Sequence, residues 1–159
     1  MSDDFEIRIP IDIDIPRDSD GFVRRECPNC EQQFKWFAHE EGDRDAEQVS
    51  QYFCPLCGQP SGVDSWWTQE QVEHGRGLAG PDMDRAVKDA LAKELKGIKG
   101  LTFKPDPNFS LEIEPPEPLH EPDDMVIAEP PCHPNEPVKV PEGSLAWVHC
   151  LICGSEFAV

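Results

Sequence analysis

The chain has 159 residues, 38% of them hydrophobic, with 17 prolines, seven cysteines and a formal net charge of −18 at pH 7. This length allows one ordinary domain or two small ones, and modules of about 40 to 60 residues usually need a metal or disulfide to be stable. The charge argues against a nucleic-acid partner, whose phosphates are bound through Lys and Arg, and no run approaches the roughly 20 apolar residues of a membrane span.

The N-terminal segment 6–15, EIRIPIDIDI, alternates isoleucine with polar residues. This period of two is typical of a strand with one buried face. Pro10 cannot donate to a neighbouring strand, so the strand should lie at a sheet edge. The turn cluster PRDSDG follows at 16–21. Residues 1–21 are therefore predicted to form a β arm.

Two cysteine pairs define a first module, residues 22–67. They read Cys-Pro-Asn-Cys and Cys-Pro-Leu-Cys-Gly. Two cysteines three positions apart across a tight turn can direct both sulfurs at one point, and two such turns supply the four-thiolate cage that Zn²⁺ favours. Buried free thiols and a redox pair are the alternatives. The pattern predicts one structural zinc ion, which leaves no open position for catalysis, bound by Cys27, Cys30, Cys54 and Cys57.

These two motifs resemble the zinc-ribbon, or rubredoxin-like, family over about 45 residues. The resemblance implies a small antiparallel β fold with the metal held between two turns. It does not imply one function, since such ribbons serve in nucleic-acid binding, protein contacts and electron transfer. Glu31 stands where rubredoxins usually have glycine, which argues against an iron electron carrier.

Residues 68–99 are predicted to form a helical connector. Thr68 and Gln71 fit a capping box that starts a short helix. Gly75, Gly77 and the Gly80-Pro81 pair should interrupt it. A second helix should start at Asp82 and end near Gly97, with an apolar stripe. We expect the stripe to pack against the rest of the protein, the alternative being the groove of a partner.

Residues 100–123 should hold two short strands and an acidic, proline-rich linker. Leu101 with Phe103, and Leu111 with Ile113, alternate as in strands. The sequence PPEPLHEPDD favours an extended linker. Met125–Glu129 is predicted to be a strand that opens the last module, residues 124–159.

The C-terminal module contains Cys150 and Cys153 in a second Cys-x-x-Cys-Gly motif and a separate Cys132. The position three residues after Cys132 is Asn135, a poor zinc ligand. His133 is the best candidate for the fourth ligand and His149 a weaker one. The alternative is a metal-free ribbon held together by its apolar strands. We predict a second zinc site formed by Cys132, His133, Cys150 and Cys153.

Together these patterns predict a mostly β fold with a short helical connector and two small zinc-ribbon-like modules. The number of cysteines is odd and most stand in close pairs, which is typical of metal ligands in a reducing compartment. We find no signal peptide at the start of the sequence. We therefore expect a cytoplasmic protein. No catalytic motif is present, so we expect no enzyme. The expected function is a protein–protein interaction or adaptor module, with a partner that presents a basic surface. The alternatives are a nucleic-acid-binding or transcription-related zinc-ribbon protein and a rubredoxin-like electron carrier.

Overall fold

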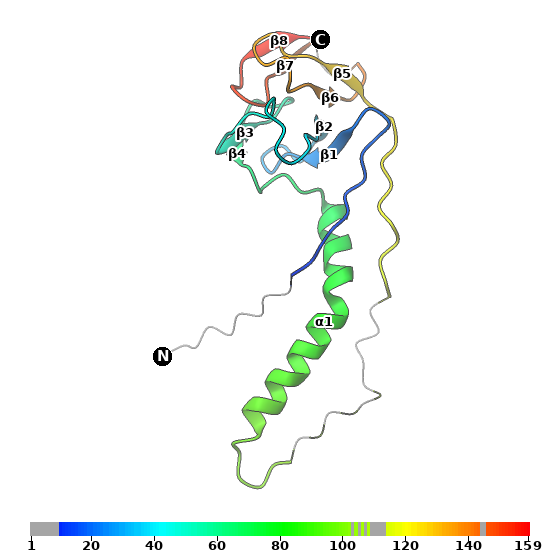
Figure 1. Cartoon of the computed structure of the whole chain (residues 1–159), viewed down its shortest axis with the longest axis vertical. Coiled ribbons are helices and arrows are strands. Elements are labelled where there is room, and N and C mark those ends of the chain that lie inside the picture. The colour runs from blue at the N-terminus through cyan, green and yellow to red at the C-terminus, as the bar shows by residue number, and fades with distance from the viewer. Residues whose placement is uncertain (1–9, 103, 105, 107, 109–113, 144–145) are drawn as a thin grey trace. The chain divides into compact units, whose positions relative to one another are not determined.

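The computed structural model describes residues 10–102, 104, 106, 108, 114–143 and 146–159 (Figure 1). Its described residues form short antiparallel strands, as predicted, and one continuous helix where two were expected. The elements are β1 Phe22–Glu26, β2 Gln33–Phe37, β3 Gln51–Phe53, β4 Pro60–Gly62, α1 Gln69–Leu95, β5 Val126–Ala128, β6 Val138–Val140, β7 Trp147–His149 and β8 Glu156–Ala158. No helix in the described ranges is long and apolar enough to cross a membrane.

The chain divides into two compact units. One, here called the cysteine unit, comprises residues 15–72 and 119–159 and contains all the strands. The other, here called the helical unit, comprises residues 1–14 and 73–118 and contains most of α1. Both cysteine modules therefore belong to the same unit.

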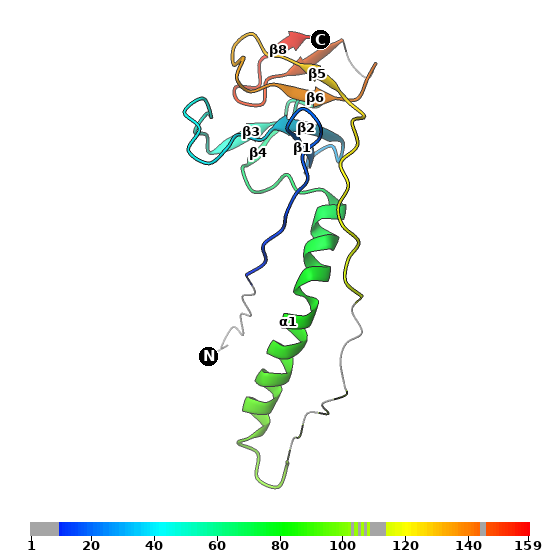
Figure 2. The same cartoon turned by 45° about the vertical axis from the view of Figure 1, so that its right-hand side comes forward.

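A four-stranded antiparallel sheet joins the two cysteine modules. Its order is β1-β2-β6-β5, so strands from the first module and strands from the last lie side by side (Figure 2). The joining pair is β2 with β6, in which Lys35 is opposite Lys139 and Trp36 is opposite Val138. Because the modules share one sheet, we expect them to fold together. The strand predicted at Met125–Glu129 is confirmed as β5.

The two C-terminal hairpins of the modules repeat one another. Each residue of the β3-β4 hairpin corresponds to the residue 96 positions later in the β7-β8 hairpin. Strand β3 starts at residue 51 and β7 at 147, and β4 starts at 60 and β8 at 156. The contacts between them are reciprocal: the Phe53 N–H donates to the Leu151 carbonyl at 2.8 Å, and the His149 N–H donates to the Pro55 carbonyl at 2.9 Å. In this numbering Phe53 corresponds to His149 and Pro55 to Leu151. The hairpins therefore pack with an approximate two-fold relation.

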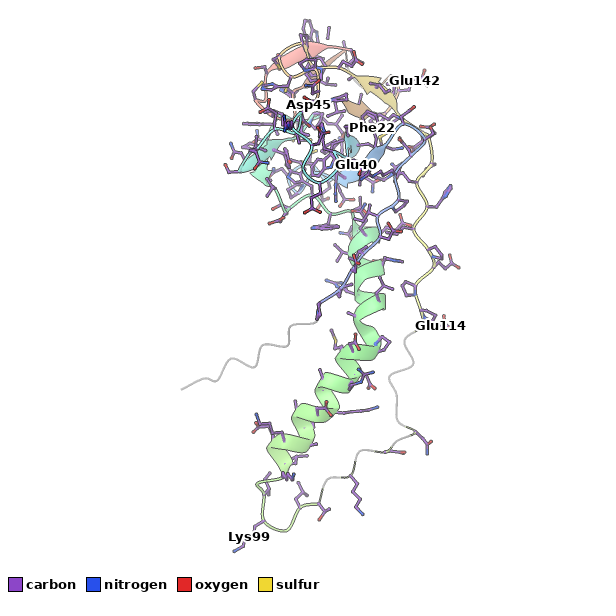
Figure 3. All side chains as sticks on the ribbon, in the orientation of Figure 1. Phe22, Glu40, Asp45, Lys99, Glu114 and Glu142 are labelled. Carbon is purple, nitrogen blue, oxygen red and sulfur yellow. The ribbon has the colours of Figure 1, made fainter. Side chains whose placement is uncertain are left out.

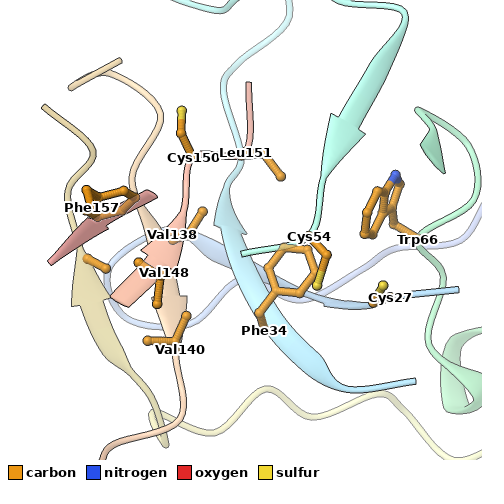
Figure 4. Close-up of a cluster of buried hydrophobic side chains, with 11 residues drawn as sticks. Cys27, Phe34, Cys54, Trp66, Val138, Val140, Val148, Cys150, Leu151 and Phe157 are labelled. Atoms are coloured by element: carbon orange, nitrogen blue, oxygen red, sulfur yellow. The ribbon is translucent and has the colours of Figure 1, made fainter. Parts of the chain in front are cut away.

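One face of the sheet carries the hydrophobic core. Side chains alternate along each strand, and those on this face pack against the two hairpins (Figure 4). Fully burying a valine, leucine or phenylalanine side chain stabilises a fold by about 1.5–3 kcal/mol. The core also contains cysteines of both modules: its buried members are Cys27, Phe34, Cys54, Trp66, Ala128, Val138, Val140, Val148, Cys150, Leu151 and Phe157.

The opposite face carries two buried lysines. Lys35 and Lys139 are 0% and 1% exposed, and their ammonium groups lie 3.1 and 2.8 Å from the same oxygen of Asp18. Each lysine also contacts two further carboxylates, which are Glu121 and Asp124 for the first and Asp20 and Asp123 for the second. These ion pairs hold two acidic segments, 18–20 and 121–124, onto the sheet.

Helix α1 starts at the predicted capping box. The Thr68 N–H donates to Gln71 Oε1 and the Gln71 N–H donates to Thr68 Oγ1, both at 3.1 Å. The predicted break at Gly80-Pro81 is wrong, because α1 continues through Pro81 to Leu95. Gly80 lacks the Cβ that a following proline ring would contact in a helix, which removes part of the steric cost.

The glycines of α1 allow close approach to neighbouring segments of the helical unit. A Cβ on Gly75 would lie 2.8 Å from Ile13 Cδ1, and one on Gly77 would lie 3.0 Å from Pro116 Cβ. The predicted packing of the apolar stripe is wrong, since Met83 is 45% exposed in the described structure. Side chains along α1 project from the ribbon on several sides (Figure 3).

The remaining strand predictions have different outcomes. Residues 10–15 of the predicted β arm form neither strand nor helix; Ile13 packs against Gly75 instead of facing a neighbouring strand. Leu101 is likewise outside any strand. The other residues of the predicted arm strand and of the two strands in 100–123, namely 6–9, Phe103, Leu111 and Ile113, lie outside the described residues.

Candidate metal centres

The four cysteines of the first module come together at one point. Cys27 Sγ lies 3.7 Å from Cys57 Sγ, and Cys30 Sγ lies 3.9 Å from Cys54 Sγ. A tetrahedral Zn²⁺ with Zn–S bonds of about 2.3 Å requires sulfurs about 3.8 Å apart. The sulfur positions therefore fit a single zinc ion.

Backbone donors support the first cysteine of each turn. Cys27 Sγ accepts the N–H groups of Asn29 and Cys30 at 3.4 and 3.5 Å. Cys54 Sγ accepts those of Leu56 and Cys57 at the same two distances. Such hydrogen bonds stabilise a thiolate, which is the form that binds metal.

Glu31 departs from the rubredoxin pattern in residue type but keeps the backbone conformation. Its φ is 59°, in the left-handed region, and Gly58 after the next pair of cysteines has φ 73°. Left-handed backbone costs a non-glycine residue roughly 1–2 kcal/mol. The turn geometry that directs two sulfurs at one ion is therefore kept at both cysteine pairs.

Burial disfavours the charged thiolate form of the cysteines in this cluster. Cys27 and Cys54 are 0% exposed, and burial raises the pKa of the Cys54 thiol. At Cys27 burial opposes ionisation, but the two backbone N–H bonds outweigh it and lower the pKa of the thiol. A bound Zn²⁺ would compensate the thiolate charge that the core otherwise disfavours.

The second cluster brings together the four residues predicted for it. Cys132 Sγ lies 3.6 Å from Cys153 Sγ, and His133 Nδ1 lies 3.4 Å from Cys150 Sγ. The ligand atoms of all four residues lie within 4.8 Å of one another. Three sulfurs and one imidazole nitrogen around Zn²⁺ require an N···S distance of about 3.6 Å. His133 therefore fits the fourth position.

His149, the weaker candidate, is used differently. Its Nδ1 atom lies 3.1 Å from the Gly154 carbonyl oxygen. A Cβ on Gly58 would lie 2.8 Å from its ring, so this glycine lets the imidazole pack between the two hairpins. His149 is not a member of the second cluster.

The two clusters differ in exposure. In the second, Cys150 is buried, whereas Cys132 and Cys153 are exposed. Hydrogen bonding with Ser155 lowers the pKa of the Cys153 thiol to about 6, which favours its thiolate form. The second cluster is therefore the more accessible to chelators.

A third group of clustered ligand atoms belongs to an ion pair. Oxygens of Asp18, Asp20 and Asp123 lie close together, but Lys139 Nζ lies 2.8, 2.6 and 2.9 Å from them. The ammonium group already occupies the position of a cation.

No known protein family, no curated protein and no solved structure matches this chain. The assignment of two zinc-ribbon-like clusters therefore rests on the cysteine spacing and on the distances given above. Sequence reasoning named every member of both clusters. It missed the lysine–carboxylate network, because Lys35 and Lys139 on short strands give no signal that distinguishes them from surface lysines.

We expect wild-type protein to release zinc to a chromogenic chelator in two phases, with the second cluster responsible for the faster one. His133→Ala should abolish the fast phase or accelerate it by more than about tenfold, because a direct ligand is lost. His149→Ala should retain both phases. Unchanged release from His133→Ala would remove His133 from the ligand set.

Proposed function

We propose that the chain is a non-catalytic zinc-binding protein that acts as a protein–protein interaction or adaptor module. The supporting observation is that each cluster supplies four ligands to one ion, which leaves no coordination position for water or substrate. A site of this kind contributes folding energy to a small unit. Zinc would then hold rigid a surface that carries strong negative charge, which favours a partner with a basic surface.

Within the cysteine unit, the placement of the cationic side chains supports the adaptor proposal over the nucleic-acid alternative. Within the cysteine unit, Arg24, Lys35 and Lys139 are largely or fully buried in ion pairs. Arg25 contacts two indole rings. This leaves Arg17, which pairs with Glu40, and Arg44. Phosphate contacts need several free cations, and this unit offers few.

The test is capture of partners by tagged full-length protein and by a Cys54→Ser variant. We expect the wild-type protein to retain specific partner proteins, and this binding to persist after nuclease treatment. The Cys54→Ser variant should not retain them. In parallel, duplex DNA and RNA should bind no more tightly than about millimolar at physiological salt. Micromolar nucleic-acid binding that weakens steeply as salt is raised would replace the adaptor proposal with the nucleic-acid alternative.

A further inference from the structure

Arg25 is a partly buried cation without a carboxylate partner. Its guanidinium carbon lies 4.5 Å from the centre of the Trp36 ring and 5.1 Å from that of Trp67. Its Nε atom is fully buried and has no hydrogen-bond partner. Across the described residues its terminal nitrogens make no hydrogen bond or ion pair either, in contrast to Arg24 on the same strand, which pairs with Glu121 at 2.9 Å.

This arrangement leaves hydrogen-bond donors available. Aromatic rings interact with the face of a guanidinium group, whereas its N–H donors lie in its plane. The terminal nitrogens of Arg25 are not fully buried, so their N–H groups can reach a ligand. A cation held in this way, with its donors unused, is preorganised for a planar acceptor.

Arg25 lines a pocket of about 300 Å³, together with the rings of Trp36 and Tyr52. This is the lower end of the size range of small-molecule sites. The two rings are 4.8 Å apart between centres and form an apolar wall. The Tyr52 hydroxyl makes no hydrogen bond to any described residue, so it is a second free donor.

One of the two glutamates that line the pocket, Glu136, already has hydrogen-bond partners. Glu136 Oε1 accepts the Glu47 N–H at 3.0 Å and lies 3.0 Å from His39 Nε2. Burial opposes the charged form of His39, but its hydrogen bond to Asp43 and the charge of Glu136 outweigh burial and raise its pKa. Beside this engaged carboxylate, the Arg25 guanidinium and the Tyr52 hydroxyl offer unused donors to the pocket.

We propose that this pocket binds a carboxylate carried on a flat apolar group, either a small free acid or the C-terminal residue of a peptide. The guanidinium of Arg25 binds both carboxylate oxygens, the Tyr52 hydroxyl donates to one of them, and the apolar group lies against Trp36. A singly charged carboxylate is favoured over phosphate because Glu136 and Glu47 line the same pocket and repel a second negative charge. This inference goes beyond the adaptor proposal and does not depend on it.

The experiment is a titration of the ¹⁵N-labelled, zinc-loaded full chain with benzoate, followed by NMR. We expect saturable shifts of the Arg25 Nε–H and Trp36 indole N–H signals, with a Kd of about 1 mM for a ligand this small. Benzamide, which is neutral, and inorganic phosphate should each bind at least about tenfold more weakly. A peptide that ends in phenylalanine is tested with a free C-terminal carboxylate and with a C-terminal amide. If the free-acid peptide binds more tightly than benzoate and the amide does not, the source of the carboxylate is a chain end. Equal affinity of benzoate and this peptide would identify a free acid.

Two variants and a matched control complete the test. Arg25→Gln should weaken benzoate at least about tenfold and Tyr52→Phe about threefold. Arg44→Gln, which removes the same charge at an exposed position, should leave the affinity within about twofold. If Arg25→Gln fails to fold, Tyr52→Phe and benzamide still decide the question. Absence of saturable benzoate binding, equal binding of benzamide or phosphate, or unchanged affinity in a folded Arg25→Gln protein would each overturn the proposal.

Discussion

Replacing Cys54 by serine is expected to remove the first metal and unfold the whole cysteine unit, beyond the residues 22–67 that form the first module. Cys54 is fully buried in the core shared by both modules, and strands β2 and β6 belong to one sheet. Structural zinc contributes about 10–16 kcal/mol in small sites, which exceeds or matches the net stability of most domains, about 5–15 kcal/mol. Loss of this metal should therefore abolish the cooperative fold.

The measurement combines zinc content with circular dichroism and tryptophan fluorescence, since Trp66 lies in the same core. The matched control is Cys132→Ser, which alters an exposed thiol of the second cluster. It should lose one metal and keep the native spectrum at low temperature. A Cys54→Ser protein with full zinc content and a native spectrum would end the four-cysteine assignment.

The Asp18→Asn substitution is expected to lower the free energy of unfolding by about 3–5 kcal/mol, because it leaves two buried lysines without their shared partner. Asp18 is 8% exposed and contacts both Lys35 and Lys139. The control is Asp20→Asn. The Asp20 side chain also contacts Lys139 but is 51% exposed, so its substitution should lower the free energy of unfolding by no more than about 1 kcal/mol. Urea unfolding of the zinc-loaded proteins measures both. Equal, small effects would show that the network does not hold the sheet face.

The difference in free energy of unfolding between wild type and Asp18→Asn depends on pH through the ionisation of Asp18. Burial opposes that ionisation, but hydrogen bonds from Lys139, the Phe22 N–H and Lys35 outweigh it and lower the pKa of Asp18 to about 2 from 3.8. The folded-state pKa lies below the unfolded one, so the stabilisation is fully present above about pH 4 and is lost as pH falls toward 2. The stability difference between wild type and Asp18→Asn should therefore stay constant from about pH 8 to pH 5, which separates it from acid release of zinc.

Local motifs determined what could be predicted from the sequence. The two Cys-x-x-Cys pairs of the first cluster and the Thr68–Gln71 capping box each span only a few residues. Both could therefore be identified from the sequence. The pairing of β2 with β6 joins residues about a hundred positions apart, and its Lys35–Lys139 register has no local signature.

Glycine positions were interpreted wrongly for a related reason. Gly75 and Gly77 look like helix breakers in the sequence, but in the structure they admit Ile13 and Pro116 to the surface of α1. Similarly, the two-fold relation of the hairpins depends on contacts such as those between Phe53 and Leu151. Apart from the Cys-x-x-Cys-Gly motif, the hairpins have little sequence in common, so the repeat was visible only in outline.

Each chain is expected to hold two zinc ions, one in each cluster. The most direct measurement is elemental analysis of the purified full chain, combined with native mass spectrometry to count the ions on each molecule. We expect two zinc ions per chain and no iron. A single zinc ion would eliminate the second site, and iron in the first would favour the electron-carrier alternative. A folded chain without metal would contradict the assignment of both clusters as metal sites.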